Sequence, residues 1–164
     1  MIAFDLYWLP TLAFLAHVFE EFGLFPAWAS RHFGRTSRPW YIYSHIVLVG
    51  LFVIVSWQAS DAVAPSLWIL AAFTFQWVIG SNALFHIAAT FWFREYSPGI
   101  LSGVCVVLPA TGWMMHHAIT LAGITSTQIW GTVILGLIIS SLVIASLWLD
   151  LGINWRGKRD KRAR

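Results

Sequence analysis

"PSLWILAAFTFQWVIGSNALFHIAATFWF", residues 65–93, contains no Asp, Glu, Lys or Arg. A membrane-crossing helix needs about 20 mostly apolar residues, because each residue adds about 1.5 Å and the hydrocarbon core is about 30 Å thick. Of the 164 residues in the chain, 59% are hydrophobic and 10% are charged, and the mean hydropathy is +0.72. Soluble domains contain about 45–50% apolar and about 25% charged residues. The sequence therefore predicts an integral membrane protein.

Four further apolar segments flank this one, at residues 5–25, 40–59, 100–121 and 127–150. Short stretches that contain Gly, Pro, Ser or Asp separate them, as expected for turns. The fold class predicted is all-α: a polytopic transmembrane helix bundle with five spans. Residues 1–155 are expected to form a single bundle domain, because no linker, low-complexity tract or repeat divides them, and residues 156–164 form a basic tail.

The cationic residues indicate how the bundle is oriented, since short cytoplasmic loops carry Lys and Arg. With five spans all ten fall on one side: Arg31, Arg35, Arg38, Arg94, Arg156, Lys158, Arg159, Lys161, Arg162 and Arg164. The N-terminus is therefore expected outside and the C-terminus in the cytoplasm. We interpret the basic tail as a topology anchor, so no nucleic-acid partner is expected. The opening "MIAFDLYWLP" has no cationic region, so the first helix is expected to remain in the mature protein.

Ionisable side chains within the spans are the candidate functional residues, because each charge near a bilayer centre is unfavourable by about 2.5–3.5 kcal/mol. The first span carries His17, Glu20 and Glu21 in the stretch "HVFEEFGLF". His17 and Glu21 share a helix face and Glu20 flanks it, so the three polar groups are expected to converge on one neighbour. Asn82 and His86 of the third span also share a face. Both sets are predicted in the cytoplasmic half of the membrane.

These residues predict a site for a divalent transition metal, with one or two ions. The predicted ligands are His17, Glu20, Glu21 and His86. Imidazole suits Zn or Fe, and carboxylates suit Fe or Mn. The H-x-x-E spacing reverses the E-x-x-H spacing of di-iron bundles, which is why two ions are also considered. Asn82 is expected to orient a ligand or the substrate.

The other histidines within the spans are weaker candidates. His45 lies near the start of the second span and is a possible extra ligand. His116 and His117 lie about 25 Å along the fourth span from its cytoplasmic end, so they are expected near the opposite face. Only a break of the helix at Pro109 and Gly112 would bring them closer to the site.

Two blocks of sequence carry a family resemblance. "HVFEEFGLFPAW", residues 17–28, and "NALFHIAATFWFREYSPG", residues 82–99, resemble the HXXEE-domain family of small bacterial membrane proteins. The resemblance runs from about residue 8 to about residue 110. It implies a multi-pass protein of the bacterial cytoplasmic (inner) membrane and supports the site, but it does not imply a particular reaction.

The resemblance also draws attention to the turn "REYSPG". If this turn folds under the bundle, Arg94 or Tyr96 is expected to cap the site from the cytoplasmic surface. The alternative is a loop that simply ends a helix with Pro98 and Gly99.

Three functions are compatible with these residues. The leading hypothesis is a metal-dependent membrane enzyme that hydrolyses or oxidises an apolar or lipid-like small molecule. Its expected catalytic residues are Glu20, Glu21, Asn82, His86, Arg94 and Tyr96. The second is a metal-free isomerase or cyclase with a protonated glutamate. The third is an ion or proton transport or binding protein, for which a homo-oligomer would provide the path. The expected partners are membrane lipids and the apolar substrate.

Overall fold

The computed structural model describes residues 5–34, 36–120 and 123–147, which form helices joined by turns. In chain order the elements are η1 (Leu6–Trp8), α1 (Leu9–Glu21), α2 (Phe25–His32), α3 (Arg38–Ser60), α4 (Leu67–Phe93), α5 (Ile100–Ser102), η2 (Gly103–Val107), α6 (Leu108–Thr120) and α7 (Ser126–Ala145). The all-α prediction is confirmed for these residues. The predicted basic tail, Arg35 and the end of the fifth span at Asp150 lie outside the described residues.

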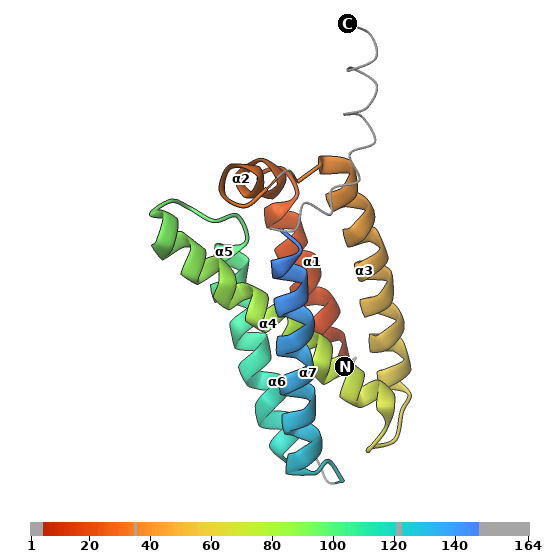
Figure 1. The fold of residues 1–164 in the computed structure, drawn as a ribbon. Helices are drawn as coiled ribbons and strands as arrows, with labels where there is room; N and C mark the ends of the chain where they lie inside the picture. Colours follow the sequence, from red (N-terminus) through yellow and green to blue (C-terminus); the bar gives the residue numbers. More distant parts are fainter. Residues whose placement is uncertain (1–4, 35, 121–122, 148–164) are drawn as a thin grey trace, which may run out of the picture.

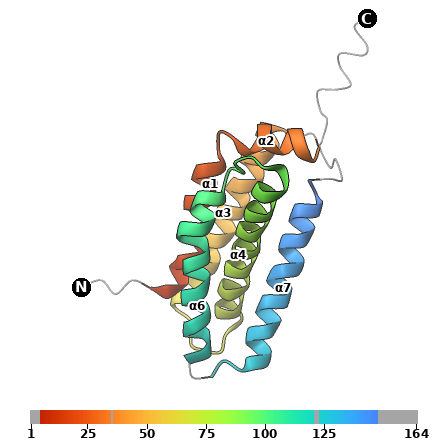
Figure 2. The same cartoon turned by 90° about the vertical axis from the view of Figure 1, so that its left-hand side faces the viewer.

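Four helices in the described part of the chain are long and apolar enough to cross a membrane. They are α3, α4, α7 and the continuous helix Ile100–Thr120, which α5, η2 and α6 form together. These helices run side by side between the same two ends of the molecule (Figure 1, Figure 2). They correspond to the second to fifth predicted spans, with boundaries that agree within a few residues where both ends are described.

Polar caps explain where three of the long helices begin. The Ser37 and Ser66 side chains, which precede α3 and α4, each accept a hydrogen bond from the N–H three residues later. Thr125 and Gln128 form a reciprocal capping box at the start of α7. Because these caps satisfy N–H groups that have no partner within the helix, each helix starts directly after its polar turn.

The first predicted span, residues 5–25, is divided in the structure. η1 and α1 extend to Glu21, residues 22–24 form a turn, and α2 then lies across the end of the bundle (Figure 1, Figure 2). Gly23 favours the turn, and Pro26 lies in the first turn of α2, where its missing N–H needs no partner within the helix. With 13 residues, α1 is shorter than the roughly 20 residues that a perpendicular crossing needs.

The continuous helix Ile100–Thr120 changes its winding near its beginning. η2 is π-helical: the N–H of Leu108 bonds to the carbonyl of Gly103, five residues earlier. An α-helical hydrogen bond spans four residues, so this segment accommodates one extra residue. The π-helical segment directly follows Ser102, the last residue of α5.

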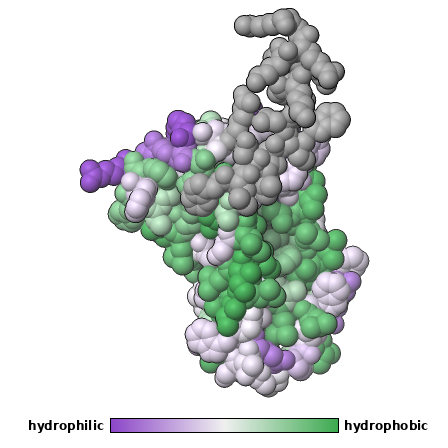
Figure 3. Space-filling model, in the orientation of Figure 1, coloured by the Kyte–Doolittle hydropathy of each residue, from purple (hydrophilic) through white to green (hydrophobic). Residues whose placement is uncertain are grey.

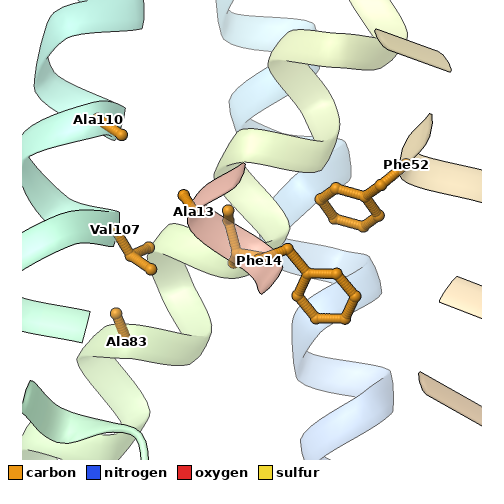
Figure 4. Close-up of a cluster of buried hydrophobic side chains, with 7 residues drawn as sticks. Ala13, Phe14, Phe52, Ala83, Val107 and Ala110 are labelled. Carbon is orange, nitrogen blue, oxygen red and sulfur yellow. The ribbon is translucent and has the colours of Figure 1, made fainter. Parts of the chain in front are cut away.

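Apolar side chains hold α1 inside the bundle. Figure 4 shows Phe14 of α1 beside Phe52 of α3, and their ring centroids are 4.5 Å apart. Small residues allow close helix contacts elsewhere: a Cβ on Gly136 of α7 would lie 2.4 Å from the Cβ of Trp77. Hydrophobic side chains cover much of the visible flank, and hydrophilic ones gather near the turn after α4 (Figure 3). Within this packing, His17 and Glu21 near the end of α1 are buried.

Candidate metal centre

A buried cluster of metal-ligand side chains lies near the end of the bundle that α2 covers. His17 and Glu21 of α1 and His86 of α4 each offer one ligand atom, and these atoms all lie within 4.8 Å of one another. Glu21 Oε1 is 3.0 Å from His86 Nε2 and 3.7 Å from His17 Nε2. The exposed fractions of the three residues are 1%, 3% and 0% in chain order. The structure thus brings together three of the four predicted ligands.

A serine hydroxyl lies beside Nδ1 of each of the two histidines, whereas Nε2 is the nitrogen that faces Glu21. Ser102 Oγ donates to the carbonyl of Gly99 at 3.3 Å and lies 3.0 Å from His17 Nδ1. With its proton on that carbonyl, the hydroxyl can accept from His17 Nδ1–H, which is the tautomer whose Nε2 carries the lone pair. Ser97 Oγ lies 2.9 Å from His86 Nδ1. Partners on the second ring nitrogen are typical of metal-binding histidines.

Asn82 and Tyr41 supply further polar groups to the cluster. The Asn82 amide nitrogen lies 3.0 Å from His17 Nε2 and 3.3 Å from His86 Nε2, so Asn82 faces both rings as its spacing predicted. The Tyr41 hydroxyl donates to Glu21 Oε2 at 3.0 Å. Tyr41 is buried on α3 and was not predicted.

Glu20 lies outside the three-residue ligand cluster. Its Oε1 accepts hydrogen bonds from the Tyr96 hydroxyl and from the N–H groups of Gly99 and Leu101, at 3.0 and 3.1 Å for the two amides. Its Oε2 accepts from the N–H of Ser102 at 2.6 Å. Successive helical residues point about 100° apart, which is why Glu20 does not converge with Glu21 as predicted. Glu20 instead anchors the start of the helix Ile100–Thr120.

In the turn at residues 94–99, Ser97 contacts His86 of the cluster and Tyr96 contacts Glu20. Burial and the hydrogen bond to Glu20 raise the pKa of Tyr96 to about 12, so this phenol is neutral at physiological pH. Arg94 is exposed and ends α4 in a left-handed conformation. No hydrogen bond or ion pair among the described residues links it to the cluster, so the structure does not place Arg94 as a cap.

Gly99 lies against the imidazole rings of His17 and His86. Its φ is +105°, a conformation that residues with a Cβ rarely adopt. A Cβ at this position would lie 2.7 Å from His17 Cε1 and 3.0 Å from His86 Cε1. A side chain at position 99 would therefore displace both imidazole rings.

The weaker histidine candidates lie at different distances from the site. His45 lies beside the three-residue cluster but outside it: its Nε2 is 3.8 Å from Glu21 Oε2. His116 and His117 lie in the last turn and a half of α6, at the opposite end of the bundle from α2 (Figure 1). The helix is continuous through Pro109 and Gly112, so these two histidines are not brought to the site.

The helix α2 covers the cluster with aromatic side chains. The Phe25 ring lies 5.6 Å from the His86 ring and 5.9 Å from the Tyr41 ring, measured between centroids. Trp28 packs beside Phe25 and is 2% exposed. These rings exclude water from the buried polar groups.

A surface ion pair fastens α2 to the turn after α4. Glu95 Oε1 lies 2.7 Å from His32 Nε2 and 3.1 Å from Arg31 Nη2. Hydrogen bonds from His32 and Arg31 lower the pKa of the Glu95 carboxyl group. Glu95 was not a candidate from the sequence, where nothing indicated that residues 63 positions apart would meet.

The sequence model of one protein family matches residues 8–114, which is more than half of the chain, and that family is described as "Protein of unknown function with HXXEE motif". The chain belongs to the HXXEE family. In this HXXEE protein the motif is His17 to Glu21, and its two glutamates have different surroundings: Glu21 joins the ligand cluster and Glu20 anchors a helix. No curated protein and no solved structure matches the chain.

Proposed function

We propose that this HXXEE protein is a metal-dependent membrane enzyme that acts on an apolar or lipid-like substrate. The observation that carries the proposal is the buried set of His17, Glu21 and His86, with ligand atoms within 4.8 Å of one another. Two imidazole nitrogens and one carboxylate oxygen suit Zn, Fe or Mn. Three protein ligands also leave a position for water or substrate, as in catalytic zinc sites.

The charge of Glu21 supports a cation at this place. The carboxylate is buried, and its ion-pair partners among the described residues are histidines. Burying a carboxylate without a compensating positive charge is strongly unfavourable. A divalent ion between Glu21 and the two Nε2 atoms would provide that charge while His17 keeps its Nδ1 proton on Ser102.

The surrounding residues suggest separate roles in such an enzyme. A bound metal ion supplies a Lewis acid that activates water or oxygen. The Asn82 amide, next to both Nε2 atoms, is placed to orient a substrate oxygen. Glu21 would act as the base with whichever oxygen is not engaged by the ion, and Tyr41 holds its Oε2. The identity of the bound metal ion would distinguish hydrolysis from oxidation.

We also propose that the protein crosses the bacterial cytoplasmic membrane five times, with its N-terminus outside and its C-terminus in the cytoplasm. The cationic residues Arg31, Arg38 and Arg94 support this orientation, since they belong to the helix ends on the α2 side of the bundle (Figure 1). From Leu6 to Glu21 the helical path is roughly 24 Å, enough for η1 and α1 to cross a locally thinned membrane.

Elemental analysis tests the metal proposal directly. The protein would be purified in detergent without chelators, together with His17→Ala, Glu21→Ala and the control His116→Ala. We expect about one equivalent of Fe, Zn or Mn in the unmodified protein and the control, and little in the other two variants. Absence of metal from the unmodified protein, even after reloading with each of the three ions, would overturn the proposal.

One distance favours a second, metal-free function. His86 Nε2 and Glu21 Oε1 are 3.0 Å apart, which is hydrogen-bond length and permits proton exchange between acid and base. A protonated Glu21 would then serve an isomerase or cyclase. Infrared spectroscopy tests this candidate, since a protonated carboxyl group has a carbonyl band that Glu21→Gln would remove. If no such band is lost in that variant, the metal-free candidate is wrong.

A further inference from the structure

His45 of α3 faces the oxygen of Glu21 that the other two histidines do not. His45 Nε2 lies 3.8 Å from Glu21 Oε2, whereas His17 Nε2 lies 3.7 Å from Oε1. Both separations are too long for hydrogen bonds. Two donors on one ion, each about 2.1 Å from it, are about 3.0–3.5 Å apart, so a shift of a few tenths of an ångström would let either pair share an ion. His45 lies outside the set of ligand atoms within 4.8 Å of one another, so joining the ion of the other three residues requires a larger movement of its side chain.

The local hydrogen bonds leave His45 Nε2 available as a ligand atom. His45 Nδ1 lies 2.7 Å from the backbone carbonyl oxygen of Tyr41, one helical turn earlier. A carbonyl oxygen only accepts hydrogen bonds, so Nδ1 carries a proton, and in the neutral imidazole Nε2 then carries the lone pair. Nδ1–H bonded to a backbone carbonyl is a common arrangement for a metal-binding histidine.

Aromatic contacts fix the orientation of the His45 ring. It lies between Tyr41, at a centroid distance of 3.9 Å, and Phe14, at 5.9 Å and an interplanar angle of 19°. Tyr41 positions both partners at once, since its carbonyl binds His45 and its hydroxyl donates to Glu21 Oε2. The relative placement of Glu21 and His45 is therefore built into the packing of α1 on α3.

We propose that His45 is a fourth protein ligand of a single ion held by His17, Glu21 and His86. The inference rests on the metal centre proposed above and adds a residue from a third helix to it. Four protein ligands fill a tetrahedral zinc site, so an open position for water or substrate then requires the larger coordination number of Fe or Mn. The His45 side chain is 20% exposed, compared with 1% for His17 and 0% for His86. It is thus the ligand that a small molecule from outside the bundle reaches most easily.

Cobalt(II) is the probe for the test, because the intensity of its visible absorption depends on the number and geometry of its ligands. The metal-free protein in detergent would be titrated with Co²⁺, alongside His45→Gln, His45→Ala and the control His116→Gln. The glutamine side chain keeps a donor for the Tyr41 carbonyl but removes the imidazole. We expect His45→Gln to change the Co²⁺ spectrum and to weaken binding by at least about tenfold, whereas His116→Gln changes neither.

Free imidazole provides the second readout. Added to His45→Ala, it should restore the original Co²⁺ spectrum, because the vacated space is partly accessible; a purely structural role for His45 predicts no such recovery.

Unchanged affinity and spectrum in His45→Gln, with Co²⁺ bound normally by the unmodified protein, would overturn this inference alone. Two Co²⁺ ions per unmodified chain and one per His45→Gln chain would overturn it too, since His45 would then serve its own ion. No Co²⁺ binding to the unmodified protein would overturn both proposals.

Discussion

Glu20 and Glu21 are adjacent in the chain, but the structure gives their carboxylates different neighbours. Glu20 receives three backbone N–H groups and the Tyr96 hydroxyl, while Glu21 faces histidines. We therefore expect Glu20→Ala to destabilise the protein by about 1–2 kcal/mol, with the loss moderated by the partial exposure of the carboxylate. Metal content per folded molecule should be retained. Unfolding in mixed detergent micelles, combined with elemental analysis, measures both quantities.

Glu21→Ala is the contrasting variant for Glu20→Ala. It should lose the metal, because it removes a ligand from the cluster and not a helix anchor. If Glu20→Ala loses metal as completely as Glu21→Ala while it remains folded, Glu20 is a ligand and the anchoring role is wrong.

A second prediction at the scale of single residues concerns Gly99. Gly99→Ala should destabilise the protein by about 2–5 kcal/mol, because it combines left-handed backbone strain with overpacking against His17 and His86. It should also abolish metal binding by displacing the rings. The matched control is Gly112→Ala, since a Cβ on that helical residue meets nothing within 4 Å. Equal stability of the two variants in the same unfolding assay would contradict the prediction.

The candidate site was only partly predictable from single residues. His17, Glu21, Asn82 and His86 stand out because polar groups at helical spacing are rare in apolar spans, and the structure brings all four together. Ser97, Ser102 and Tyr41 give no comparable signal, since hydroxyl residues are common in membrane helices and turns. Their roles depend on which segments meet, and that is decided by packing.

At the scale of elements, α2 depends on its attachment to the turn after α4. The pKa of Glu95 is lowered by His32 and Arg31, so the charged form is favoured in the folded protein. The contribution to stability is therefore present above the ordinary carboxyl pKa of 4.5 and is lost as the pH falls through the lowered value. We expect α2 to be less protected from hydrogen exchange at acidic pH than near neutrality.

Glu95→Gln separates this effect from the intrinsic pH dependence of exchange. The α2 amides of the variant should exchange faster than those of the unmodified protein above pH 4.5, and the two rates should approach each other as the pH falls. A ratio that stays constant across this range would show that Glu95 does not hold α2.

Long apolar helices were the most predictable elements. α3, α4, α7 and the helix Ile100–Thr120 follow from the length of uninterrupted apolar sequence, and the first three have polar caps at their starts. The break between α1 and α2 was missed because residues 22–25 are nearly all apolar and match a continuing span. The family resemblance drew attention to the turn at residues 94–99, but its contact with Glu20 was missed, since backbone N–H groups leave no trace in a sequence.

At the scale of the whole molecule, the five-span arrangement predicts which surfaces face the cytoplasm. In a Cys105→Ser background, a membrane-impermeant maleimide should label Asp61→Cys in intact cells, because the turn after α3 lies outside in this topology. Ala27→Cys, on the exposed side of α2, should be labelled only after the cells are permeabilised. Labelling of Ala27→Cys in intact cells would show that α2 faces outward and that the proposed orientation is reversed.

The wide turn of η2 lets α5 and α6 keep a common helical phase although one extra residue lies between them. Val107 and Ala110 belong to the apolar core, while Ser102 faces His17 and presents its N–H to Glu20. In a regular α-helix of the same length, the extra residue would rotate α5 by about 100° relative to α6, and Ser102 would turn away from the imidazole. The winding of this segment is therefore as much a part of the site as any side chain.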